Sequence, residues 1–128
     1  MFTMAQIDDL HARLGRADSL GDYLRGLAAA GVVRFESLVS DGRSEFFSAD
    51  GLRVVSPAHH EVLQVAEVSD RTTFLEHLRR HSAGETSYLE MSKSLADSGV
   101  EKWVADTTAL TMSYLDRAGV VLLVETIE

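Results

Sequence analysis

Hydrophobic side chains recur at every third or fourth position in four segments of the chain. Met4, Ile7, Leu10 and Leu14 form the first such stripe, which has the spacing of one face of an α-helix. Ser, Thr or Asp stands before each segment and Gly follows it, as at the starts and ends of helices. The sequence therefore predicts helices between residues 3 and 15, 19 and 31, 70 and 84, and 87 and 99.

Two of these helix starts have the sequence of a capping box. Thr3 is followed three residues later by Gln6, and Ser87 by Glu90. In the last helix, the spacing also predicts that Tyr88 faces the core.

The hydrophobic period drops to two in six further segments, which is typical of strands. In the first of them, Phe35 and Ser37 alternate with Arg34 and Glu36. The expected strands lie at residues 33–39, 44–49, 52–55, 100–107, 110–117 and 120–127. Residues 58–69 mix both periods, and there we expect a short helix followed by a strand.

The second half of the chain repeats the pattern of the first. A shift of 68 residues superposes Gly31 on Gly99, Arg34 on Lys102, Phe35 on Trp103, and Gly51 on Gly119. We therefore expect an α+β fold, a two-layer α/β sandwich of two pseudo-symmetric α-α-β-β-β repeats with a mostly antiparallel sheet. The repeats would span about residues 2–60 and 70–128 of a single domain, residues 1–128. The alternative is that two α+β halves align this well by chance.

The composition narrows the functional classes. The chain has 128 residues, 45% of them hydrophobic, a net charge of −8 and no cysteine. Without cysteine there is no disulfide, thiolate zinc site or thiol nucleophile. The acidic balance and scattered cations argue against binding nucleic acid or an anionic membrane. No segment has the pattern of a signal peptide or spans a bilayer, so we expect a cytoplasmic protein.

A group of charged residues on the two central strands is the main candidate for function. Arg34 and Glu36 share one strand face, and the repeat places Lys102 and Asp106 on an equivalent face. If the aromatic residues pack on the helices, these charges project from the opposite side of the sheet as two cation–acid pairs. The candidate recognition face consists of Arg34, Glu36, Lys102, Trp103, Asp106 and Tyr114. The structural alternative is a solvated face with cross-strand ion pairs, which add little stability.

Other candidate chemistry is sparse. His77 and His81 lie four residues apart on one helix face, which is half of a metal site without a third ligand. No nucleophile motif, phosphate loop or dinucleotide fingerprint is present. We therefore expect no catalytic residues, no cofactor and no resident metal.

The sequence resembles a known family over essentially its whole length. The segment SYLEMSKSLADSGVEKWVADTTALTMSYLDRAGVVLLVETI is similar to the C-terminal signature of small bacterial proteins labelled "phage envelope protein", a family of unknown function with a YdfO-like fold. The segments FTMAQIDDLHAR and FESLVSDGRSEFFSADG resemble its start and middle. The resemblance implies a compact two-layer α+β domain of phage-derived origin, and it implies no chemistry.

These observations favour a soluble, non-enzymatic binding or protein-interaction module. Its partner would be another protein or a second copy in a homodimer. One alternative is a small-ligand-binding domain whose site lies between the repeats, with Trp103 and Tyr114 lining a pocket together with the charged pairs. An enzyme of unknown class is a further alternative, without residues that support it.

Overall fold

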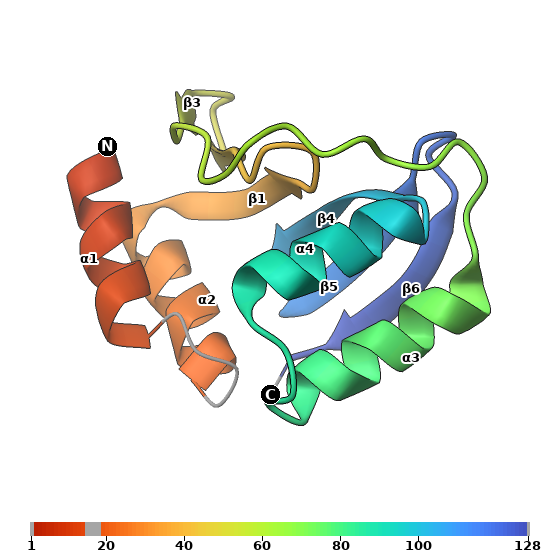
Figure 1. Ribbon diagram of the computed structural model, residues 1–128. Coiled ribbons are helices and arrows are strands. Elements are labelled where there is room, and N and C mark those ends of the chain that lie inside the picture. The colour runs from red at the N-terminus through yellow and green to blue at the C-terminus, as the bar shows by residue number, and fades with distance from the viewer. Residues whose placement is uncertain (1, 15–18, 128) are drawn as a thin grey trace.

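The computed structural model describes residues 2–14 and 19–127 of the chain. Within them, two helices and three strands are followed by two helices and three strands again (Figure 1). The first set is α1 (Met4–Leu14), α2 (Leu20–Ala30), β1 (Val32–Leu38), β2 (Ser44–Ser48) and β3 (Arg53–Val55). The second is α3 (Arg71–Ser82), α4 (Tyr88–Asp97), β4 (Val100–Asp106), β5 (Thr111–Asp116) and β6 (Val121–Thr126). The predicted α+β class and repeat pattern are confirmed; the expected end of the first helix at Gly15 lies outside the described residues.

Both predicted capping boxes form. The Thr3 amide donates to Gln6 Oε1 at 2.8 Å, and the Gln6 amide donates to Thr3 Oγ1 at 3.3 Å. The Ser87 amide donates to Glu90 Oε1 at 3.0 Å, and the Glu90 amide donates to Ser87 Oγ at 3.2 Å. Because these bonds satisfy donors that a helix start leaves free, local sequence fixes where α1 and α4 begin.

The six strands form one antiparallel sheet in the order β3-β2-β1-β4-β5-β6. The two halves meet at its centre, where the register of β1 and β4 pairs Arg34 with Asp106, Glu36 with Val104, and Leu38 with Lys102. The shift of 68 residues exchanges the outer two pairs and relates Glu36 to Val104, the residue it already faces. The pseudo-twofold axis therefore passes between Glu36 and Val104.

The helices cover one face of this sheet (Figure 1). Tyr23 of α2 meets Phe35 of β1 with ring centroids 6.1 Å apart, and Phe74 of α3 meets Tyr114 of β5 at 5.1 Å. Tyr23, Phe35, Phe74 and Tyr114 are all buried, and their strand positions share one face of the sheet. The core is thus a single layer of side chains between helices and sheet.

The segment between β3 and α3 was predicted wrongly. Residues 58–69 form neither helix nor strand, because their hydrophobic residues do not share a face: Val62 and Val68 are 80% and 82% exposed, whereas Val65 is buried. The backbone is held by other elements instead. The Ala66 amide donates to the Ala96 carbonyl at 2.9 Å, at the end of α4.

Tyr88 also departs from its predicted position. It occupies the first turn of α4 and is 46% exposed, while Met91, Ser92, Leu95 and Ala96 fill the inward face. In the part of the chain that the structure describes, no helix has the length and apolar character needed to cross a membrane.

Candidate functional site

The sheet face opposite the helices is uncovered, and we call it the open face. Three rows of directly opposed residues cross it. They are Arg53-Phe47-Arg34-Asp106-Thr111-Thr126, Val55-Glu45-Glu36-Val104-Ser113-Val124, and Leu38-Lys102-Leu115-Val121. None of these side chains is buried, whereas the alternate positions on the same strands supply the core. Any function of the sheet surface must therefore use these residues.

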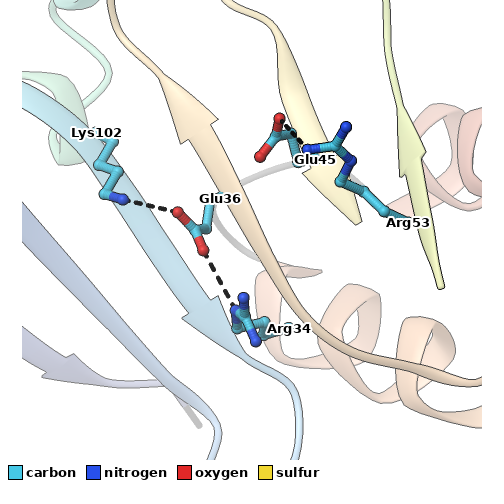
Figure 2. Close-up of polar contacts among 5 residues, drawn as sticks. All are labelled: Arg34, Glu36, Glu45, Arg53 and Lys102. Carbon is cyan, nitrogen blue, oxygen red and sulfur yellow. Dashed lines mark hydrogen bonds and ion pairs between the residues drawn. The ribbon is translucent and has the colours of Figure 1, made fainter. Parts of the chain in front are cut away.

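A chain of ion pairs occupies the centre of the open face (Figure 2). Lys102 Nζ of β4 lies 2.8 Å from Glu36 Oε1, and Arg34 Nε lies 3.3 Å from Glu36 Oε2. Glu36 is the best protected of the three side chains, with 18% of its surface exposed. One carboxylate of β1 thus binds two cations that the two repeats place at equivalent positions.

This arrangement sets the charge state of Glu36. Burial acts to raise the pKa of Glu36, but hydrogen bonds and charge attraction from Lys102 and then Arg34 outweigh it and lower the pKa below its ordinary value. At neutral pH the group is therefore an ionised hydrogen-bond acceptor. Such a group suits fixed polar recognition better than proton transfer.

A second ion pair lies beside the first (Figure 2). Glu45 of β2 stands directly opposite Glu36, and such a pair of like charges is unfavourable unless each charge is compensated. Arg53 of β3 compensates Glu45 at 3.4 Å. The Arg34 guanidinium also lies 4.0 Å above the Phe47 ring, a cation–π contact. With Asp106, these groups give the open face three positive and three negative side chains.

Asp106 has a different role from the predicted cation–acid pair. It stands opposite Arg34 in the register, but its Oδ1 accepts the amides of Thr108 and Ala109 at 2.8 and 2.9 Å. These bonds close the turn that follows β4. The two cations are instead brought together on Glu36.

Trp103 and Tyr114 lie on the helix side of the sheet. They are directly opposite each other, and Trp103 is opposite the buried Ser37. Burial first, and then the Glu125 carboxylate, raises the pKa of Tyr114 well above its ordinary value. The sheet separates these two aromatic residues from the charged residues, so the six predicted site residues cannot line one common pocket.

The predicted pair of histidines lies on α3, away from the open face. His81 Nδ1 is 3.0 Å from the Thr86 hydroxyl. Within residues 2–14 and 19–127, no group of three His, Cys, Asp or Glu side chains is placed to hold a metal ion.

Sequence reasoning missed the apolar side of the open face. Val104, Leu115, Val121 and Val124 lie on it, and Val121 and Val124 are 51% and 56% exposed. The repeat offered a signal, because the shift of 68 residues that relates the halves places Val104 on Glu36. A strand position that is charged in one repeat and aliphatic in the other indicates an unequal surface.

Comparison with known proteins gives one match. The family model described as "Protein of unknown function (DUF1398)" matches residues 9–126. No curated protein matches the chain.

Proposed function

The chain belongs to the DUF1398 family of proteins of unknown function, and we propose that it is a non-enzymatic protein-interaction module whose contact surface is the open face. One observation carries this proposal: a six-stranded sheet is covered by helices on one face and leaves aliphatic and charge-compensated side chains on the other. Antiparallel sheets can expose one face to water, but that face is then usually polar.

The side chains of the open face suit a protein partner. Val55, Val121 and Val124 are each at least 39% exposed, and grouped apolar exposure of this kind marks interaction sites. The ion pairs around Glu36 fix the directions of its donors and acceptors. A protein surface can match such a mixed pattern, whereas a small ligand would need an enclosing pocket.

The finer kinship and location also stay proposals. A phage-derived, YdfO-like origin rests on the resemblance of residues 87–127 to proteins labelled "phage envelope protein". A cytoplasmic location rests on the absence of cysteine and of a signal-peptide pattern.

Site-specific photo-crosslinking in cells tests the interaction. A benzophenone amino acid replaces Val104, at the centre of the open face, and in a matched control it replaces Ala28, which is exposed on α2 in the helix layer. We expect discrete protein adducts from position 104 and none of the same mass from position 28. Adducts from position 28 alone, or from neither position, would contradict the proposal.

A further inference from the structure

The open face is divided into a charged part and an uncharged part. Five of its six charged side chains gather around β1 to β4 in the network of Figure 2, and Asp106 closes the turn after β4. The remaining part, which we call the valine patch, consists of Val104, Thr111, Ser113, Leu115, Val121, Val124 and Thr126. It contains no ionisable side chain and covers β5, β6 and the middle of β4.

The valine patch is continuous across the three strands. Val104, Ser113 and Val124 are directly opposed neighbours, and Leu115 and Val121 form the adjacent pair. Val120, in the turn before β6, extends it and is 55% exposed. Water therefore contacts an aliphatic strip that natural antiparallel sheets normally place against a partner.

The free edge of β6 is a poorer contact than this face. The register of β5 and β6 is interrupted beside Leu115, and Arg71 Nε donates to the Leu122 carbonyl at 2.8 Å. A bulge and a side chain on the backbone are both devices that prevent another strand from pairing with an edge. A partner is thus directed to the side chains of the patch.

We propose that the valine patch binds the same patch of a second copy of this chain, in a two-fold symmetric dimer. This proposal rests on the proposed function, because it names the partner of the same open face. Each chain carries a net charge of −8, so two copies repel each other wherever charged surfaces meet. The valine patch is an uncharged surface on which two such chains can meet, and it is self-complementary because both sides are aliphatic.

The charge network sets the position of the second copy. Burying Glu36 and Glu45 under aliphatic side chains would remove water from ions without new partners, at a high cost. A two-fold axis that lies parallel to the strands above β5 avoids this cost. It stacks β4 over the partner's β6 and leaves β1 to β3 of both copies outside the contact.

The size of the patch predicts a weak dimer. Three strands about 4.8 Å apart and roughly 20 Å long give about 300 Å² of flat sheet per copy. A standard stable interface buries about 800 Å² per partner, so this contact belongs to the reversible class. Self-association should therefore depend on concentration and exchange rapidly.

Sedimentation equilibrium of the full chain over a wide concentration range tests the proposal. The wild type should show a reversible monomer–dimer equilibrium. Val124→Lys should weaken it at least about tenfold, because it places two like charges near the symmetry axis of an apolar contact. Val62→Lys is the matched control: it makes the same change of charge at a valine that is 80% exposed on the segment between β3 and α3, and it should leave association unchanged.

Salt provides a second measurement on the unmodified protein. Raising the ionic strength from about 0.05 M to about 0.5 M screens the repulsion between two acidic chains and should strengthen the dimer. A wild type that stays monomeric throughout, a dimer weakened by salt, or equal effects of Val124→Lys and Val62→Lys would overturn the proposal. If Val124→Lys fails to fold, Val121→Lys and the salt series decide.

The two proposals fail separately. Crosslinks from position 104 that join the chain only to other proteins would overturn the dimer and support the interaction module. Adducts of twice the chain mass of 14.0 kDa would support both.

Discussion

Lys102 Nζ lies 2.8 Å from Glu36 Oε1, and this ion pair joins residues 66 positions apart in the chain. Glu36 lies on the pseudo-twofold axis, while Lys102 and Arg34 are related by it. A symmetric pair of cations thus serves a single acid, because the second repeat has Val104 where the first has Glu36. The relationship makes the two cations directly comparable, since they bind the same carboxylate from equivalent strand positions.

Double-mutant cycles should show that Lys102 is coupled to Glu36 more strongly than Arg34 is. The Lys102 contact is shorter, and its side chain is 32% exposed against 47% for Arg34. We expect a coupling free energy of about 0.5–1 kcal/mol for Glu36 with Lys102 and a smaller one with Arg34. Urea unfolding of Glu36→Gln, Lys102→Met, Arg34→Met and the two double variants measures both. Equal couplings, or a larger one for Arg34, would contradict the geometry.

The same carboxylate should make stability depend on pH in the acid range. The pKa of Glu36 is lowered from 4.5, because Lys102 and Arg34 outweigh the effect of burial. A lowered pKa in the folded state means that the ionised group stabilises the fold above pH 4.5, and that this stability is lost as the pH falls through the folded-state value. The difference in unfolding free energy between wild type and Glu36→Gln should therefore shrink below pH 4.5. A difference that stays constant down to pH 2 would refute this role for Glu36.

Two glycines with the same backbone angle offer a comparison of packing. Gly99 and Gly119 both have φ of +83°, so alanine pays a similar backbone cost at either. A Cβ at Gly99 would lie 2.6 Å from Ser69 Cα and 2.8 Å from the Val68 carbonyl oxygen, whereas nothing lies within 4 Å of one at Gly119. We expect Gly119→Ala to cost about 1 kcal/mol and Gly99→Ala about 2 kcal/mol more. Thermal unfolding of the pair measures the difference, and equal losses would mean that the backbone of residues 68–69 moves freely aside.

This glycine also shows how far the sequence reaches. Its left-handed conformation and its place at the end of a helix follow from local chemistry, and so do both capping boxes and the alternation that exposes Arg34 and Glu36. The close approach of residues 68–69 does not follow, because it depends on a long-range path of the chain. The same path explains why residues 58–69 were mistaken for a helix and a strand.

The candidate site was predictable only in part for a similar reason. Alternation assigns residues of one strand to two faces, and it correctly separates Arg34 from Phe35. It does not tell which acid a long cation will reach across strands. Asp106 was an equally good partner for Arg34 by register, yet it binds the amides of Thr108 and Ala109 in the next turn. Competition between a local backbone bond and a distant ion pair is decided in three dimensions.

The tyrosines should resist ionisation at alkaline pH. Burial, and then the charge of Asp8, raises the pKa of Tyr23 to about 12, and burial raises that of Tyr114 further still. A raised pKa means that this stability is fully present below pH 10 and is lost as the pH rises toward 12. Absorbance of tyrosinate should therefore appear together with the loss of helical circular dichroism. Ionisation of Tyr23 near pH 10 in a protein that is still folded would contradict its burial.

Trp103 should contribute to stability and not to association. It was predicted as part of the recognition face, but it lies on the helix side of the sheet, half-buried against the core and opposite Tyr114. Replacing it by Phe keeps an aromatic ring and removes part of the packing, so Trp103→Phe should lower the free energy of unfolding by about 1 kcal/mol. Its monomer–dimer equilibrium should match that of the wild type, in contrast to Val124→Lys on the opposite face. Because the sheet is one residue thick, this pair of variants asks which side of it the partner touches. A loss of association in Trp103→Phe at unchanged stability would place the contact on the helix side and remove the basis for assigning it to the open face.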